Sequence, residues 1–100
     1  MPQGESSIKD KTHNNIQLPS MYEVLFINDD ITPMDFVIVL LTEIFFHNFE
    51  DAYNLMMKVH TEGMAVVGIY SYDIALSKIS KATDISRQEG YPLRIIMRKQ

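Results

Sequence analysis

The stretch YEVLFINDDITPMDFV, residues 22–37, spans the end of one secondary-structure element and the start of the next. Residues 22–27 are mostly β-branched, aromatic or aliphatic, which is typical of a strand. Thr32 suits the N-cap of a helix, Pro33 its first position, and Asp35 follows three residues after the cap. The stretch therefore predicts a strand, a short polar loop and a helix.

A second helix should follow the first one closely. Apolar residues continue at helical spacing after Pro33, so one face of the first helix is expected to pack on the sheet. Asn48 suits the N-cap of the second helix, which should run to about Thr61 and end at Gly63. The apolar face of the first helix comprises Phe36, Val37, Leu40, Leu41, Ile44 and Phe45.

The rest of the chain adds two strands and a third helix. Residues 64–70, MAVVGIY, are too few and too rich in β-branched side chains for a helix, and they predict a central strand. Ser71 suits the N-cap of the third helix, and Gly90 and Pro92 mark its end. Residues 93–97, LRIIM, predict the last strand. The inner face of the third helix is expected to hold Ile74, Ala75, Ile79, Ala82 and Ile85.

The predicted order of elements is β-α-α-β-α-β, which indicates an α/β (α+β) fold. We expect a compact single domain, residues 21–100, with three helices packed on one face of a small three-stranded sheet. A length of 100 residues fits one domain. Residues 1–20 are polar with only scattered apolar side chains, so they predict a flexible N-terminal extension that buries too little surface to offset chain entropy.

Composition excludes several classes of protein. The net charge of -4 argues against nucleic-acid binding, which relies on a basic surface. The absence of cysteine excludes disulfides and thiolate metal sites. No signal or transit peptide and no apolar stretch of bilayer length is recognisable. These features predict a soluble, cytoplasmic protein without a membrane or nucleic-acid partner.

Polar residues from the first strand and the second helix are expected to meet. If the strand continues beyond residue 27, side-chain alternation points Asn28 and Asp30 the same way and Asp29 the other way. His60 would then approach Asn28 and Asp30 over an apolar floor, which makes a small pocket with a polar rim. The second helix has three residues at i, i+3 and i+4, and hence on one face: Met56, Val59 and His60.

Such a rim suits a free α-amino group. This group is mostly protonated at neutral pH, because its pKa is about 8, and it then offers three hydrogen-bond donors. Asn28, Asp30 and His60 supply an amide oxygen, a carboxylate and an imidazole nitrogen as acceptors. Methionine side chains beside them adapt to bulky aliphatic and aromatic groups.

Each of these residues also has a structural explanation. Polar residues after a strand are commonly a turn, a single histidine is often hydrogen-bonded within the fold, and methionines are often core residues. A metal-dependent hydrolase is a further alternative, but the chain has no H-E-x-x-H pair, no Gly-rich phosphate loop and no nucleophile elbow. We therefore predict no catalytic residue, no metal and no cofactor. The metal alternative would draw its ligands from Asp29, Asp30, His47 and His60.

Three separated motifs occur in register along the chain: NDDITPMDFV at residues 28–37, AYNLMMKVHTEG at 52–63 and YPLRI at 91–95. Together they resemble the ClpS family, adaptors that hand N-degron substrates to a Clp AAA+ unfoldase, over residues 20 to about 98. Ile31 departs from the family, in which an aromatic residue is common at this position. The resemblance implies an adaptor that binds proteins with Leu, Phe, Tyr or Trp as first residue and delivers them to the Clp protease for degradation.

The resemblance also implies individual roles at the pocket. Asn28, Asp30 and His60 would hold the α-ammonium group of the substrate, and Asp29 would help through a water molecule. Met34 would be a gatekeeper whose bulk excludes β-branched first residues. The side-chain pocket would be lined by Thr32, Met34, Val37, Met56, Val59 and Leu93.

A second surface is implied on the third helix. Asp73 and Lys78 match positions that dock on the N-terminal domain of the Clp unfoldase, although a charged pair is ordinarily a solvated helix face. The extension before residue 20 would take part in substrate hand-over, and we expect a monomer. The alternative is a docking module or paralogue that binds the unfoldase and modulates its substrate choice without recognising N-termini.

Overall fold

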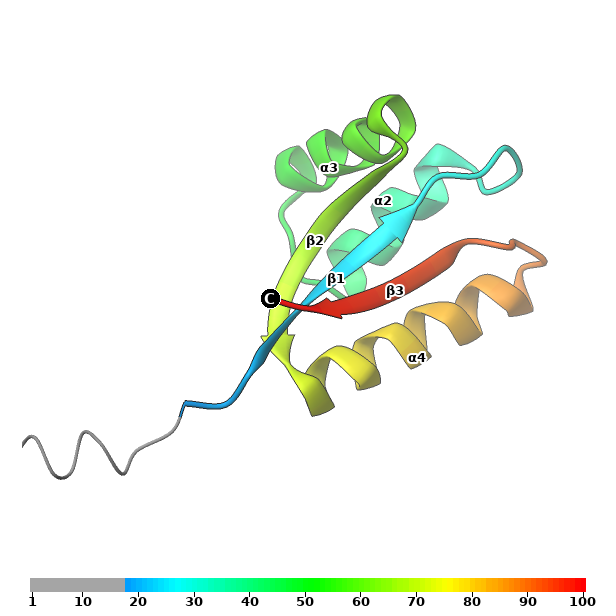
Figure 1. Cartoon of the computed structure of the whole chain (residues 1–100). Helices are drawn as coiled ribbons and strands as arrows, with labels where there is room; N and C mark the ends of the chain where they lie inside the picture. The colour runs from blue at the N-terminus through cyan, green and yellow to red at the C-terminus, as the bar shows by residue number, and fades with distance from the viewer. Residues whose placement is uncertain (1–17) are drawn as a thin grey trace, which may run out of the picture.

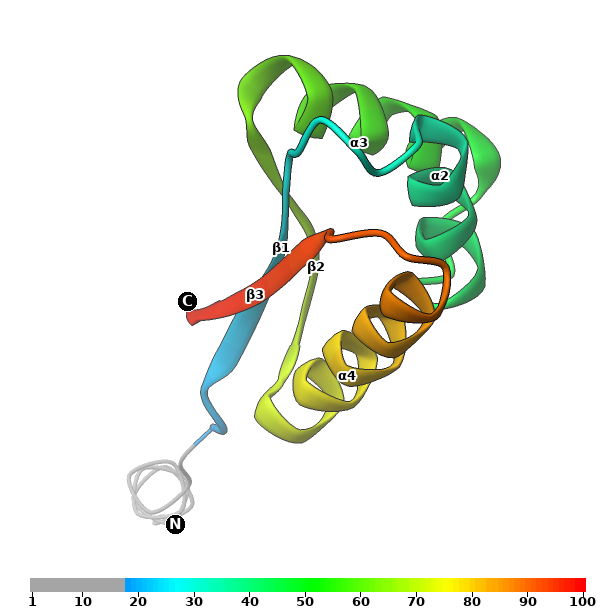
Figure 2. The same cartoon turned by 90° about the vertical axis from the view of Figure 1, so that its right-hand side faces the viewer.

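The structure, a computed structural model, describes residues 18–100, so the predicted extension at residues 1–20 lies almost entirely outside the described residues. Six elements follow one another in the predicted order (Figure 1). The three helices lie on one side of the sheet, as predicted (Figure 2). The elements are β1 (Met21–Ile27), α2 (Met34–Glu43), α3 (Phe49–Glu62), β2 (Met64–Ser71), α4 (Tyr72–Gln88) and β3 (Arg94–Lys99).

The sheet is built around β1. Its strand order is β2-β1-β3, and both neighbours run antiparallel to β1. The prediction that residues 64–70 form the central strand is wrong, because β2 lies at an edge. Val24, Leu25 and Phe26 of β1 are consecutive and almost fully buried, which fits a strand that has a neighbouring strand on each side. A β-branched run such as that of β2 indicates a strand but not how many neighbours it has.

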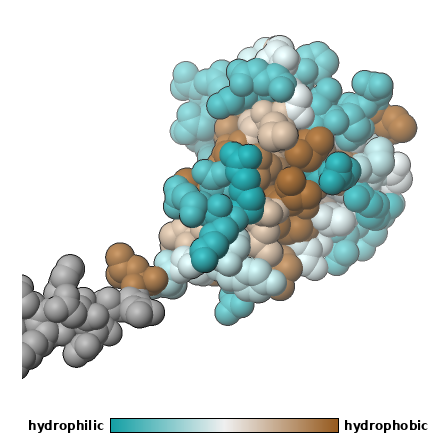
Figure 3. All heavy atoms as spheres, viewed as in Figure 1, coloured by the Kyte–Doolittle hydropathy of each residue, from teal (hydrophilic) through white to brown (hydrophobic). Residues whose placement is uncertain are grey.

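The face of the sheet away from the helices is open and partly apolar. Figure 3 shows apolar side chains over the middle of this face, with hydrophilic side chains beside them. Leu25 lies here between its cross-strand partners Val66 and Ile96. Arg98 Nε donates a hydrogen bond of 2.7 Å to Glu23 Oε1 on the same face. Neighbouring strands thus bury Leu25 without a helix on this side.

An irregularity in β2 is tied to the corner between α2 and α3. The register of β2 with β1 shifts between Val24 and Leu25, so β2 has one extra residue there. His47, in the corner, donates a hydrogen bond of 2.6 Å from Nε2 to the Val67 carbonyl oxygen. This bond fastens the corner to the sheet and gives His47 a structural partner.

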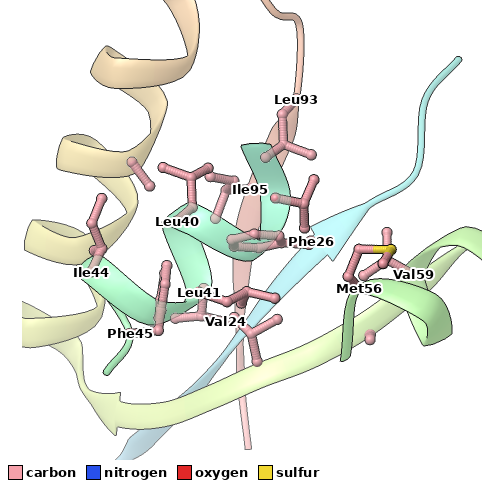
Figure 4. Close-up of a cluster of buried hydrophobic side chains, with 14 of the residues drawn as sticks. Val24, Phe26, Leu40, Leu41, Ile44, Phe45, Met56, Val59, Leu93 and Ile95 are labelled. Atoms are coloured by element: carbon pink, nitrogen blue, oxygen red, sulfur yellow. The ribbon is translucent and has the colours of Figure 1, made fainter. Parts of the chain in front are cut away.

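The hydrophobic core fills the space between the sheet and the three helices. Phe26 of β1 lies at its centre and meets the Phe45 ring edge to face, with ring centroids 5.4 Å apart. Figure 4 shows side chains from α2, α3, β1 and the start of β3 converging there. The residues predicted to face the core from this helix are buried in five cases: Val37, Leu40 and Leu41 within α2, and Ile44 and Phe45 directly after its end.

One residue predicted to face inward, Ile74, does not, and another, Phe36, packs against the core only at its border. Ile74, in the first turn of α4, is 51% exposed, because Ala75 and Ala82 occupy the face that lies closest to the core. Phe36 is partly buried and packs edge to face on the Tyr91 ring, 4.8 Å between centroids, at the border of the core. Ser71 is the N-cap of α4, as predicted, although its side chain makes no capping hydrogen bond.

The ends of the first two helices confirm one cap and correct another. Asn48 caps α3, because its side chain accepts a 2.8 Å hydrogen bond from the Asp51 N–H, and Gly63 ends that helix with φ 92°. The N-cap of α2 is Pro33 and not Thr32, whose side chain is bonded within the preceding loop. Among residues 18–100, no helix is long and apolar enough to cross a membrane.

Candidate functional site

The end of β1 lies beside the end of α3. The Asn28 backbone N–H donates a hydrogen bond of 2.9 Å to the carbonyl oxygen of Gly63, the residue that ends α3. His60 lies in the last turn of the same helix. This backbone bond joins two segments that are far apart in the sequence, and it brings Asn28 and His60 to one cavity.

A cavity of about 210 Å³ opens among the strand-tip loop (residues 28–33), the start of α2 and the end of α3. Its floor is apolar, because Val37, Met56 and Val59 are all buried. Met34 is 43% exposed and lies where the cavity meets solvent. The cavity is lined by Asn28, Asp29, Asp30, Thr32, Met34, Val37, Met56, Val59 and His60.

Leu93 is the one predicted pocket residue that does not line this cavity. Its side chain is 1% exposed and belongs to the same buried cluster as Val37 and Met56. Figure 4 shows Leu93 beside the start of β3, as one of the side chains of this cluster. Leu93 thus supports the apolar floor through packing, because the residue just before β3 points into the core.

The polar rim of the cavity comprises Asn28, Asp30 and His60, all of which are exposed. Within residues 18–100, none of these three side chains makes a hydrogen bond to another side chain or to the backbone. Their amide, carboxylate and imidazole groups are therefore available to a ligand.

Asp29 differs from the rim residues, since both of its carboxylate oxygens have partners. Oδ1 accepts hydrogen bonds from the backbone N–H groups of Ile31 (2.8 Å) and Thr32 (2.7 Å), and Oδ2 accepts one of 2.8 Å from Thr32 Oγ1. Burial raises the pKa of Asp29, but these hydrogen bonds and the charge of Arg87 outweigh burial. The pKa of the carboxyl is therefore lower than its ordinary value of 3.8.

The expected alternation of side chains across Asn28, Asp29 and Asp30 does not occur. Strand β1 ends at Ile27 and the chain turns, so all three side chains line the same cavity. A threonine three residues after an aspartate is a spacing at which a side-chain oxygen can accept from nearby backbone N–H groups. The hydrogen bonds between Asp29 and Thr32 could therefore have been predicted from this spacing.

The two residues predicted to dock on the unfoldase lie in different environments. Asp73 is exposed in the first turn of α4, whereas Lys78 is partly buried. The Lys78 ammonium donates a hydrogen bond of 2.6 Å to the Ile44 carbonyl oxygen at the end of α2. Burial, together with the charge of Lys81, lowers the pKa of Lys78. Its Nζ also lies 4.5 to 5.7 Å from three ring centroids, those of Phe45, Phe46 and Tyr70.

Metal ligands are not grouped in the described part of the chain. Residues 18–100 contain no set of three or more His, Cys, Asp or Glu side chains placed to hold a metal ion. His47 precedes the first turn of α3 and His60 lies in its last turn, which separates them by about 20 Å. The ligand set of the metal-dependent alternative therefore does not converge.

Comparison with known protein families and curated proteins gives consistent matches. The model of the family described as "ATP-dependent Clp protease adaptor protein ClpS" matches residues 17–96 of this chain. The chain is 41% identical over 93 residues to the ATP-dependent Clp protease adapter protein ClpS of Burkholderia mallei (strain SAVP1), covering 93% of this chain and 89% of that protein. It is 49% identical over 82 residues to the protein of the same name from Nautilia profundicola, covering 82% of this chain and 84% of that protein.

Among solved structures, the chain is similar to Agrobacterium tumefaciens ClpS2 bound to L-phenylalaninamide. The two have a TM-score of 0.80 and 36% sequence identity, and the match covers 83% of this chain and 100% of that chain.

Proposed function

Since this chain belongs to the ClpS family of ATP-dependent Clp protease adaptors, we propose that it binds N-degron substrates by their first residue and delivers them to a Clp AAA+ unfoldase. The proposed first residues are Leu, Phe, Tyr and Trp. The chain would act by binding alone, as an adaptor and not as an enzyme, and without a cofactor.

The observation that carries this proposal is the presence of free acceptors and a buried apolar floor in one cavity. An α-ammonium group has three N–H donors and one positive charge. Asn28, Asp30 and His60 offer an amide oxygen, a carboxylate oxygen and a ring nitrogen, with no competing partner within residues 18–100. Hydrogen bonds from a cation to a carboxylate are among the stronger ones in proteins, so Asp30 is the main charge partner in this proposal.

The position of the rim at the end of α3 also favours a cation. The last turn of a helix leaves carbonyl groups without intrahelical partners, and its dipole is negative at this end. His60 lies in that turn, so an amine bound beside it is stabilised by about 0.3–1 kcal/mol through the dipole. The amine is therefore attracted by the helix end as well as by the rim.

The floor of the cavity suits a bulky apolar side chain. Burial of a Leu or Phe side chain against Val37, Met56 and Val59 contributes about 1.5–3 kcal/mol. Met34, at the opening, would restrict the space next to the Cβ atom and so exclude β-branched first residues. The ligand of A. tumefaciens ClpS2, an aromatic amino acid amide, is of the kind that this cavity would accept.

A second part of the proposal concerns the unfoldase. Asp73 and Lys78 would contribute to docking on its N-terminal domain, and the chain would work as a monomer in the cytoplasm. Asp73 would contact the partner directly, since it is exposed on α4. Lys78 would contribute by holding α2 and α4 together, because its ammonium already has the Ile44 carbonyl as partner.

Peptide titration tests the proposed function. A peptide that begins with Phe and has a free amine is expected to bind with a Kd of about 1 μM or tighter, near -8 kcal/mol, and acetylation of the amine should abolish most of this affinity. An Asp84→Ala variant, which removes an exposed charge on α4, serves as a control and should bind like the unchanged protein. Equal affinity for both peptides would rule out amine recognition and favour the docking-module alternative.

A further inference from the structure

We propose that Asp29 is a positioning residue: it holds the strand-tip loop in the shape that presents Asn28 and Asp30 to the ligand, and it does not itself bind the amine. This inference rests on the proposed function, because it concerns the same cavity. The resemblance implies that Asp29 contacts the amine through water. We infer instead that Asp29 supports the positions of Asn28 and Asp30.

The hydrogen bonds of the loop carry the inference. The Asn28 N–H is bonded to Gly63 before the loop, and the Val37 N–H is bonded to Pro33 after it. Between these two bonds, the backbone donors of Ile31 and Thr32 both go to Asp29 Oδ1. The loop lies beyond the end of β1, so these two N–H groups have no strand partner within the described residues. The Asp29 carboxylate accepts their hydrogen bonds instead.

The second carboxylate oxygen of Asp29 is also engaged. Oδ2 accepts a hydrogen bond of 2.8 Å from Thr32 Oγ1, and Thr32 immediately precedes Pro33, the N-cap of α2. Proline has no N–H to donate, so the loop lacks a backbone donor at that position. The Asp29 carboxylate therefore joins the tip of β1 to the residue that leads into α2.

The two neighbours of Asp29 show the opposite arrangement. Asn28 and Asp30 are exposed, line the cavity and have side chains without partners within residues 18–100. Asp29 is less exposed and makes three hydrogen bonds to Ile31 and Thr32. To bind an amine, Asp29 would have to give up or share these bonds, whereas its neighbours would not.

Three variants separate positioning from direct binding. Asp29→Ala removes all three hydrogen bonds. Asp29→Asn keeps an oxygen that accepts from both backbone N–H groups but removes the charge. Thr32→Val keeps the backbone donor and removes only the hydroxyl. Asp35→Ala, which removes a nearby exposed carboxylate on α2, is the matched control.

The readouts are the Kd for the free-amine Phe peptide and the amide hydrogen exchange of Ile31 and Thr32 in the free protein. Asp29→Ala should weaken binding about tenfold or more and speed exchange at both amides. Asp29→Asn should remain within about threefold of the unchanged protein and keep both amides protected. Thr32→Val should lie between these two, and Asp35→Ala should change neither readout.

Two results would overturn the inference. Equal losses in Asp29→Asn and Asp29→Ala would assign a direct electrostatic role to the carboxylate, and unchanged affinity in Asp29→Ala would assign it no role in binding. Failure of the proposed function looks different, because the unchanged protein would then not distinguish the free peptide from the acetylated one. Unaltered exchange at Ile31 and Thr32 in Asp29→Ala would refute the support of the loop independently of any peptide.

Discussion

The polar rim of the cavity and the contact between α4 and the end of α2 both contain polar residues, but the hydrogen bonding of these residues differs. Asn28, Asp30 and His60 reach the cavity without a partner among residues 18–100. Lys78 instead donates to the Ile44 carbonyl at 2.6 Å and lies over aromatic rings. One region has its hydrogen-bonding capacity free, and the other has used it to join two helices.

This difference indicates which polar residues can serve a ligand. A free group exchanges only water when a ligand arrives, whereas a bonded group must also give up an internal hydrogen bond. Asp29 belongs with Lys78 by this criterion, although its sequence neighbours belong to the rim. The comparison therefore predicts separate effects on ligand binding and on stability.

The largest expected effect is on binding. Asp30→Ala removes the charge partner of a partly desolvated ammonium, which should cost about 2–5 kcal/mol in peptide affinity by titration calorimetry. The free energy of unfolding should change by less than about 0.5 kcal/mol, because the side chain has no internal partner. Asp84→Ala is the control for loss of an exposed carboxylate. A binding loss below about 0.5 kcal/mol would take Asp30 out of the site.

The contact between α4 and the end of α2 should respond in the opposite way, with a loss of stability and no loss of peptide affinity. Lys78→Met keeps an apolar stem against the aromatic rings but leaves the Ile44 carbonyl without its charged donor, so urea denaturation should show about 1–3 kcal/mol lower stability. Peptide affinity should stay the same. Lys81→Met removes an exposed ammonium from the same helix and should cost less than about 0.5 kcal/mol. If both variants lose the same free energy of unfolding, the hydrogen bond from Lys78 to the Ile44 carbonyl does not contribute measurably to stability.

A smaller effect concerns selectivity at the mouth of the cavity. Met34→Ala should open space beside the Cβ atom of the first residue and improve binding of Val- or Ile-initiated peptides by about 1 kcal/mol or more. Val39→Ala, at a half-exposed position on the outside of α2, should leave peptide selectivity unchanged. Continued rejection of Val and Ile by the Met34 variant would place the selectivity elsewhere.

The smallest expected effect is that of pH on the Asp29 hydrogen bonds, because the carboxyl stays ionised near neutral pH. Its pKa is lowered in the folded protein, so its contribution is fully present above the ordinary value of 3.8 and is lost as the pH falls through the lower folded value. The amide NMR signals of Ile31 and Thr32 should therefore be constant from about pH 7 to 5 and should shift only below about pH 4. Asp29→Asn should lack this transition. A transition above pH 5 in the unchanged protein would contradict the claim that hydrogen bonds stabilise the ionised form of Asp29.

The sequence predicted the elements well because their signals are local. The cap at Asn48, the glycine stop at Gly63 and the apolar face of α2 each depend on residues within one or two turns. The same reasoning gave Thr32 as a cap, which is wrong because the nearby Asp29 competes for its hydroxyl. It also gave β2 the central position, since strand order depends on pairing with distant segments.

For the cavity, the resemblance indicated the residues and the fold shows how they meet. Nine of the ten predicted pocket and amine residues line one cavity, while Leu93 is buried in the core beside it. Their binding roles remain a proposal. Sequence reasoning missed the three hydrogen bonds of Asp29 and the bond from Lys78 to Ile44, since a residue type does not state which acceptor it will meet.

The sequence by itself determined the family, the order of strands and helices and the supply of polar and apolar groups around the Asn-Asp-Asp segment, because motif spacing and hydrophobic periodicity lie within the chain. Tertiary structure alone decided which of those polar groups stay free. The Asn28–Gly63 bond joins the strand tip to a helix end, and Lys78 reaches Ile44 from another helix. Hydrogen-bond partners are assigned by distance in space, and only folding sets that distance.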